Sequence, residues 1–345
     1  MAYTTINKST EHFNTKLYTG NGSTQSITGV GFQPDFTWLK SRNNTYDNFL
    51  YDAVRGQGKY LQSNRTSAEA DTDQMTSFDS DGYTVGVTGG VATNGSGSTM
   101  ASWNWKANGA GSANTAGSIN STVSASATSG FSIVSYTGTG SLATVGHGLG
   151  VAPAMIIIKN RSTTNGWEVY HQSLGNTKYM QLHTTSAEGT SATRWNNTSP
   201  TSTVFTVNTE GGVNSSGGNL IAYCFSEVKG YSKFSSYTGN GNADGTFVYL
   251  GFKPAFVMLK NTTTAASWLM YDNKRLGYNV DNNELVANTS AAEETYDQID
   301  ILSNGFKMRA NGTSTNKSGD TFIYMAFAEA PLVGGTGAGV PCTAR

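Results

Sequence analysis

Two patterns of apolar positions recur along the chain. In residues 102–105 apolar and polar side chains alternate, with Trp103 and Trp105 on one side and Ser102 and Asn104 on the other. This period of two is typical of a strand with one buried face. The runs at 36–39, 155–158 and 256–259 are instead almost continuously apolar. Such runs predict central strands that are covered on both faces, for instance by a neighbouring domain.

Turn-forming dipeptides separate these runs. Asn-Gly or Asp-Gly pairs begin at Asn21, Asp81, Asn304 and Asn311, and they supply the positive φ angles that tight hairpins need. The pattern predicts no helix of useful length. The fold class that follows is all-β, with each unit a β-sandwich of the jelly-roll or lectin-like kind.

The same order of landmarks occurs three times. The interval from a proline to the tyrosine that closes the next strand is 17 residues in all three copies. The landmarks of the three copies are the Tyr-Thr-Gly-x-Gly motifs at Tyr18, Tyr136 and Tyr237, the prolines Pro34, Pro153 and Pro254, the tyrosines Tyr51, Tyr170 and Tyr271, the Ser-Ala-Glu segments ending at Glu69, Glu188 and Glu293, the apolar residues Met75, Trp195 and Ile299, the aromatics Tyr83, Phe205 and Phe306, and the final pairs Trp103/Trp105, Tyr223/Phe225 and Met325/Phe327. A repeated order of this kind indicates tandem copies of one unit.

The landmarks divide the chain into three tandem β-sandwich domains. Their ranges are 1–110, 111–228 and 229–345, and the second begins with a lead-in rich in Gly, Ser and Ala. We expect residues 121–124 to form the opening strand of the second copy and residues 3–6 that of the first. Trp195 aligns with Met75 and Ile299, so it is expected in a core.

Composition and charge exclude several classes of partner. Charged residues are 13% of the chain, the net charge is −1 and lysines and arginines are scattered, so no basic surface for nucleic acid is indicated. No apolar run is long enough to cross a bilayer, and the first residues lack the pattern of a signal peptide. Cys224 and Cys342 form neither a metal-ligand pattern nor a disulfide framework. Synthesis in a reducing cytoplasm is therefore expected.

The residues supply little for catalysis. Of the four histidines only His171 falls at a landmark, where the other copies have Asp52 and Asp272, and it is interpreted as a solvated residue at a loop edge. The recurrence of Glu69, Glu188 and Glu293 favours a structural role, such as capping a helical turn, over an active site. The Asp79-Ser-Asp-Gly82 segment is interpreted as a turn, because no glutamate follows at calcium-loop spacing. We expect no enzyme activity, no metal site and no cofactor.

Two loops change length while the intervals between core landmarks stay constant. Loops on a rigid framework tolerate such changes and often carry binding sites, although neutral drift in length is the alternative. Residues 196–202 of the second copy and 273–283 of the third are therefore expected to line exposed surfaces that touch a partner. The candidate binding residues are Asn196, Asn197, Ser199, Lys274, Arg275 and Tyr278.

The chain resembles a repeat-domain family of tailed bacteriophages, particularly marine and cyanobacterial ones. The resemblance lies in the Tyr-Thr-Gly-x-Gly motifs and in four further segments, which are Gly-Phe-x-Pro-x-Phe at 31–36 and 251–256, Val-Gly-His-Gly-Leu-Gly at 145–150, Glu-Val-Lys-Gly-Tyr-Ser-Lys-Phe at 227–234 and Val-Pro-x-Thr-Ala-Arg at 340–345. It implies a virion structural protein, tail-fibre-like or part of an appendage, and it supplies no catalytic residues.

This resemblance implies a function in attachment. The expected protein binds host-surface glycan or protein, contacts other virion proteins and forms a homotrimer. It would be made in the host cytoplasm and located in the virion. The alternative is a capsid decoration or cement protein on the phage head, and a depolymerase is disfavoured because the chemistry for it is missing.

Overall fold

The computed structural model describes residues 4–86, 91–276, 279 and 282–331. In this part of the chain the regular structure is almost entirely antiparallel strand, with helical pieces of only three or four residues. The all-β prediction is confirmed. No helix among the described residues has the length and apolar character needed to cross a membrane.

The first repeat is a sandwich of two sheets. Its large sheet has the order β1-β9-β3-β4-β5-β6 and its small sheet the order β2-β8-β7. The strands are β1 (Phe13–Thr19), β2 (Gln25–Thr28), β3 (Phe36–Ser41), β4 (Phe49–Asp52), β5 (Lys59–Gln62), β6 (Ala70–Asp71), β7 (Met75–Asp79), β8 (Gly82–Val85) and β9 (Thr99–Trp105), and a 3-10 turn, η1 (Ser9–Glu11), precedes them. The segment at residues 79–82 is the turn of the β7–β8 hairpin, as predicted.

The second repeat has the same plan with a longer large sheet. The order is β10-β11-β12-β19-β14-β15-β16-β17, and β13 pairs with β18 to form the small sheet. The elements are β10 (Ser112–Asn114), β11 (Ser121–Ser126), β12 (Phe131–Thr137), β13 (Ala143–Gly146), β14 (Met155–Asn160), β15 (Trp167–His171), β16 (Lys178–Gln181), β17 (Gly189–Thr190), α1 (Ala192–Trp195), β18 (Val204–Val207), α2 (Gly211–Asn214) and β19 (Asn219–Phe225). The strand expected at 121–124 lies within β11, whereas residues 4–6 of the first repeat form no strand.

The third repeat returns to the plan of the first. Its sheets have the orders β20-β28-β22-β23-β24-β25 and β21-β27-β26. The strands are β20 (Ser232–Thr238), β21 (Phe247–Tyr249), β22 (Phe252–Asn261), β23 (Leu269–Asp272), β24 (Asn282–Val286), β25 (Glu294–Tyr296), β26 (Ile299–Leu302), β27 (Gly305–Met308) and β28 (Thr321–Pro331). Each sheet therefore takes all its strands from one of the three ranges expected from the sequence.

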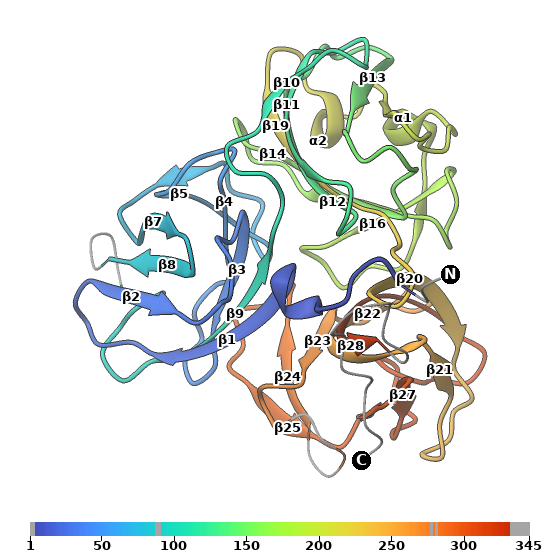
Figure 1. Cartoon of the computed structure of the whole chain (residues 1–345). Helices are drawn as coiled ribbons and strands as arrows, with labels where there is room; N and C mark the ends of the chain where they lie inside the picture. The colour runs from blue at the N-terminus through green and yellow to red at the C-terminus, as the bar shows by residue number, and fades with distance from the viewer. Residues whose placement is uncertain (1–3, 87–90, 277–278, 280–281, 332–345) are drawn as a thin grey trace.

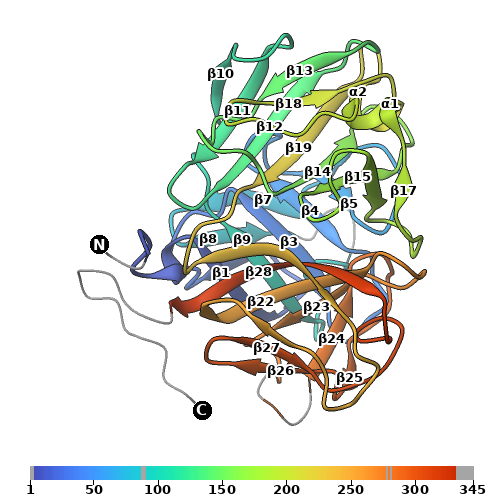
Figure 2. The same cartoon turned by 90° about the vertical axis from the view of Figure 1, so that its right-hand side faces the viewer.

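The three large sheets surround a common centre. Figure 1 shows the repeats as three lobes, blue to cyan, green to yellow and orange to red, and Figure 2 shows the same body from the side. One face of each large sheet covers its own small sheet, and the other faces the centre. The strands β3, β14 and β22 are buried along their whole length, which confirms the prediction from their continuous apolar runs.

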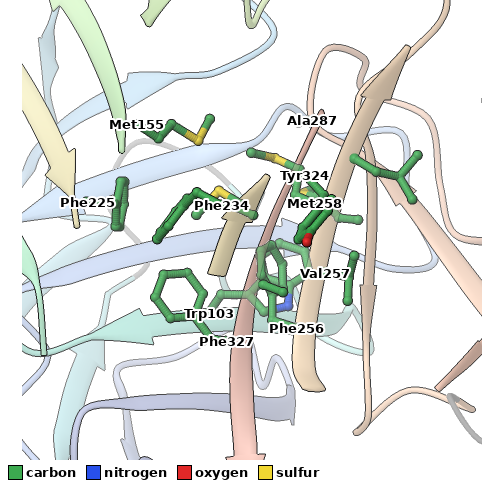
Figure 3. Packing of buried hydrophobic residues seen from close by; sticks show 14 of the residues in the cluster. Trp103, Met155, Phe225, Phe234, Phe256, Val257, Met258, Ala287, Tyr324 and Phe327 are labelled. Carbon is green, nitrogen blue, oxygen red and sulfur yellow. The ribbon is translucent and has the colours of Figure 1, made fainter. Parts of the chain in front are cut away.

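Aromatic side chains from equivalent positions meet at the centre. Trp105 and Phe225 end the last strands of the first two repeats, and Phe327 is the equivalent residue within β28. Their ring centroids lie 5.7 to 6.3 Å apart in every pairing. Figure 3 shows Phe225 and Phe327 close together, with Trp103 and Phe256 beside them. The arrangement has a pseudo-threefold axis, and the three repeats share a central hydrophobic core. The first and second repeats each also enclose a separate core between their two sheets.

Candidate functional site

The first candidate loop, residues 196–202, presents amides and hydroxyls to solvent. It follows α1, whose final turn leads into Asn196 and Asn197 with φ angles of 51° and 50°, a left-handed conformation that asparagine tolerates. Asn197 and Ser199 are exposed. The Ser199 hydroxyl accepts a hydrogen bond of 3.1 Å from the Asn176 amide. The exposed surface expected here is present.

Two side chains of this loop region are structural. The side-chain Oδ1 of Asn196 accepts a hydrogen bond of 3.3 Å from the Asn208 amide, so this half-buried side chain serves the loop itself. Trp195 is only 2% exposed and its indole N–H donates to the carbonyl oxygen of Lys178 at 3.1 Å. The prediction that Trp195 lies in a core is confirmed.

One prediction for the second candidate loop, residues 273–283, is wrong. Arg275 was expected on an exposed surface, but it is 1% exposed. Its guanidinium pairs with Asp272 at 2.6 Å and Glu293 at 2.9 Å and donates to the carbonyl oxygen of Met270 at 3.0 Å. A buried arginine with all these partners cannot contact another protein or a glycan. Asn273, Asn282 and Asn283 of the same expected surface are also buried.

The remaining candidates of this loop are Lys274 and Tyr278. Lys274 is exposed, and Tyr278 lies outside the described residues. Lys274 does not adjoin the first loop but lies beside β1 of the first repeat. There it borders a shallow depression of about 330 Å³, whose other lining residues are Asn14, Thr15, Lys16, Leu17 and Gly29. Two lysines therefore border a depression on the boundary between the first and third repeats.

Arg275 belongs to a buried network that recurs in the first repeat. Arg55 is also fully buried and pairs with Asp52 at 2.5 Å and Glu69 at 3.3 Å. Burial by itself would lower the pKa of Arg55, but Asp52, Tyr223 and Glu69 outweigh it and raise that pKa. The signal for this network was present in the sequence, because Asp-x-x-Arg occurs at 52–55 and at 272–275.

Each network reaches into the adjoining repeat. The Tyr223 hydroxyl of the second repeat donates to Asp52 of the first at 2.7 Å. The Trp103 indole of the first repeat donates to Asp272 of the third at 3.0 Å. Tyr223 and Trp103 are equivalent landmarks, so the same contact is made at two of the three boundaries.

The recurring glutamates bind neighbouring repeats as well. Arg161 of the second repeat holds Glu69 with two hydrogen bonds of 2.8 Å, and Arg42 of the first holds Glu293 in the same way. The backbone N–H groups of Glu69, Glu188 and Glu293 each donate to a carbonyl oxygen of the next repeat, at 2.7 to 2.9 Å. The expected structural role is present, but it joins repeats and does not cap a helical turn.

The boundary between the second and third repeats is built differently. His171 and Leu174 stand where the other repeats have Asp and Arg, and Glu188 pairs with Lys178 of its own repeat. His171 is fully buried, so its interpretation as a solvated residue is wrong. Its Nε2 donates to the carbonyl oxygen of Tyr324 at 3.2 Å, and burial lowers its pKa to about 4. This imidazole is neutral at pH 7.

Three equivalent lysines are buried near the repeat boundaries. Lys40, Lys159 and Lys260 are each 0% exposed, and burial lowers the pKa of each to about 8. Their ammonium groups donate to backbone carbonyl oxygens, and those of Lys40 and Lys260 also reach the neighbouring repeat at Ser290 and Thr185. Lys40 and Lys260 therefore connect neighbouring repeats, and none of the three lysines is exposed to a partner.

The described residues offer no metal centre. Nowhere in residues 4–331 outside the gaps do three or more His, Cys, Asp or Glu side chains gather in a way that could hold a metal ion. The free Cys224 is buried within β19, where burial raises the pKa of its thiol. What the exposed loops offer chemically is hydrogen bonding by amides, hydroxyls and a few lysines.

Comparison with known proteins places the chain in a family. Residues 8–331 match the family described as a domain of unknown function, DUF7483, and the chain belongs to that family. The matched segment runs from just before η1 to the end of β28, so one family unit spans all three repeats. No curated protein sequence matches the chain.

Proposed function

We propose that this protein is a non-enzymatic structural component of a tailed-phage virion, part of a tail-fibre-like appendage that binds the host surface. The observation that carries the proposal is the shared core of three sandwiches around one axis. Such a body is rigid, and a rigid framework is what a surface protein needs to present loops in fixed positions. The resemblance of the sequence motifs to phage repeat domains supports the same function.

The exposed loop of Asn197 and Ser199 is the proposed contact with host glycan or protein. Amides and hydroxyls on a surface with few charges suit hydrogen bonding to a neutral polymer. Lys274 stands apart on another repeat and would serve a different contact. The protein would be made in the host cytoplasm and carried in the virion.

The homotrimer stays a prediction. Subunit contacts are not needed to cover the apolar faces of the central strands, because in this chain the neighbouring repeats cover those faces. The remaining argument for three copies is attachment to a symmetric virion site.

A capsid decoration protein is the second candidate. The pseudo-threefold axis favours it, because a body with three similar repeats can make three similar contacts where three capsid subunits meet. The two functions place the protein at opposite ends of the virion.

Immunogold labelling of intact virions tests the proposal. An antibody against this chain is expected to label tails, and labelling of heads would favour decoration instead. Incubation of the purified protein with host polysaccharide is expected to release no reducing ends, and their release would contradict the non-enzymatic function. Replacing residues 196–202 by the corresponding first-repeat loop is expected to leave folding intact and weaken adsorption to cells.

A further inference from the structure

The three repeats differ at one sheet edge. The strands β1, β12 and β20 are equivalent, since each ends with the Tyr-Thr of its Tyr-Thr-Gly-x-Gly motif. In the second repeat β11 pairs with β12 along six residues and β10 pairs with β11. Among the described strands, β1 pairs only with β9 and β20 only with β28. The second repeat thus shows an added strand at an edge where the other two have none among the described residues.

The outward-facing backbone groups of β1 can be identified. The side chains of Ser102 and Asn104 on β9 donate to the carbonyl oxygens of Lys16 and Asn14, at 3.3 and 3.1 Å. These two carbonyls therefore face β9. Because successive residues of a strand direct their backbone groups to opposite sides, those of Thr15 and Leu17 face away from it.

The equivalent edge of β20 is protected. The Gln172 amide of the second repeat donates to the carbonyl oxygen of Phe234 at 2.5 Å, and Lys233 donates to that of Tyr249 at 2.7 Å. Phe234 is the equivalent of Thr15, so Gln172 occupies one of the outward-facing acceptors. A side chain that occupies an outward-facing acceptor in this way hinders strand addition.

At β1 no described residue supplies the corresponding cap. Asn273 is the equivalent of Gln172 and is one methylene shorter. It is 5% exposed, yet neither its Nδ2 nor its Oδ1 has a partner among the described residues. The Thr15 hydroxyl is buried and unpartnered in the same sense. Buried polar groups without partners are rare, so these groups point to a missing ligand.

The surroundings of this edge favour an acidic occupant. The depression along β1 is bordered by Lys16 and Lys274. The acid near Lys16 is Asp81, whose carboxylate already accepts hydrogen bonds from the N–H groups of Gly29 and Gly31. Those hydrogen bonds, with Lys16 as a smaller cause, lower the pKa of Asp81. Lys16 and Lys274 together carry two positive charges, and Asp81 supplies one negative charge. The edge therefore has an excess of positive charge.

We propose that the outer edge of β1 is a strand-acceptor site for an extended segment of another protein chain. The segment adds antiparallel to β1, as β11 adds to β12, and it carries an acidic side chain opposite Lys16. The backbone of Thr15 and Leu17 supplies the pairing groups, and Lys274 borders the site from the third repeat. This addition of a strand to a sheet edge is a common mode of peptide recognition.

The internal hairpin supplies a probe. In the second repeat Val123 of β11 lies opposite Val134, which is the equivalent of Lys16. A labelled peptide with the sequence of residues 112–126 and the change Val123→Glu therefore places a carboxylate opposite Lys16. Fluorescence anisotropy with the whole protein is expected to show saturable binding. The variant Lys16→Glu should bind this peptide at least about fivefold more weakly, as expected for a lost and reversed charge contact.

The matched control is Lys233→Glu, the same charge reversal on the protected edge of β20. It is expected to leave peptide affinity unchanged. A peptide with Val123→Lys should reverse the preference and bind Lys16→Glu better than the unaltered protein. Equal binding of the acidic peptide to the unaltered protein and to Lys16→Glu would overturn the proposal, and so would no binding at all.

Hydrogen exchange gives a second test that needs no variant. The amide of the half-buried Leu17 is expected to exchange rapidly in the free protein, and the amides of Leu17 and Thr15 are expected to become more protected with the peptide. Protection confined to other strands would contradict the site. Protection of these amides that rises with protein concentration, without peptide, would show that a second copy takes the edge and would overturn the assignment to a different chain.

Discussion

The indole N–H of Trp103 donates a hydrogen bond of 3.0 Å to the carboxylate of Asp272, which belongs to a different repeat 169 residues away. The same carboxylate pairs with the buried Arg275 at 2.6 Å. One side chain of the third repeat therefore holds both its own arginine and the last strand of the first repeat. This contact closes the ring between the two ends of the described chain.

The substitution Asp272→Asn should destabilise the protein strongly. It leaves Arg275 with Glu293 as its remaining carboxylate in a fully buried position, and removing one partner of a buried ion pair costs about 3 kcal/mol or more. Urea unfolding measures the change. The control Asp300→Asn removes a more exposed pair with Arg309 and should cost less than about 1 kcal/mol. Equal losses in the two variants would contradict the importance of the buried network.

Stability should fall in acid through His171. Its pKa is about 4 in the folded protein against 6.5 as the ordinary value, so between these pH values the unfolded state binds more protons. Stability from the neutral imidazole is complete above pH 6.5 and is lost as the pH falls toward 4, by about 3 kcal/mol. Between pH 7 and pH 4 the free energy of unfolding should fall less for His171→Asn than for the unaltered protein. An equal fall in the free energy of unfolding for the two proteins would show that another group causes the loss.

The substitution Lys159→Met should stabilise the protein at pH 7. The folded pKa of Lys159 is about 8 against an ordinary 10.5, so the unfolded state binds more protons between these values and stability rises with pH there. Below pH 8 the cost of burying the charge is fully present. Removing it should add about 1–3 kcal/mol, reduced by loss of the hydrogen bond to the Asn160 carbonyl oxygen. The exposed control Lys106→Met should change stability by less than about 0.5 kcal/mol.

A circular permutant should fold. The order 110–331 followed by 4–109, joined by a flexible linker of about ten residues, keeps the contacts between repeats that the described residues make and breaks the chain only at an exposed turn. A single unfolding transition near that of the unaltered protein is expected. Separate transitions for the repeats, or failure to fold, would show that the chain order and not the shared core maintains the ring.

Local sequence patterns predicted the β-sandwiches but not the way in which the three repeats close into a ring. The alternation around Trp103 and the continuous run at 36–39 gave the strands and the faces they bury, because period and composition are local properties. The positions of Arg275 and His171 depend on residues more than 100 positions away, such as Trp103 and Tyr324, and local periodicity carries no such information. Comparison of Asp-x-x-Arg at 52–55 and 272–275 with His-x-x-Leu at 171–174 was the available signal.

The loops were predicted less well for a related reason. Exposure of Asn197 and Ser199 follows from polar residues in a turn, and the structure has them at the surface. Arg275 looks equally polar in sequence, but its contacts with Asp272, Glu293 and the Met270 carbonyl oxygen hold it in a buried position. Residue type alone does not distinguish a solvated arginine from one that is neutralised inside the protein.

The centre formed by Trp105, Phe225 and Phe327 has a consequence for how the protein behaves on dilution. Three separate subunits meeting at such a centre would come apart as their concentration falls. Here the three strands belong to one polypeptide. The effective concentration of each strand for the other two is set by the segments of chain that connect them. Assembly of the ring therefore does not depend on protein concentration. A substitution at one of the three aromatic positions leaves the residues at the other two unchanged, whereas in a homotrimer it would change all three.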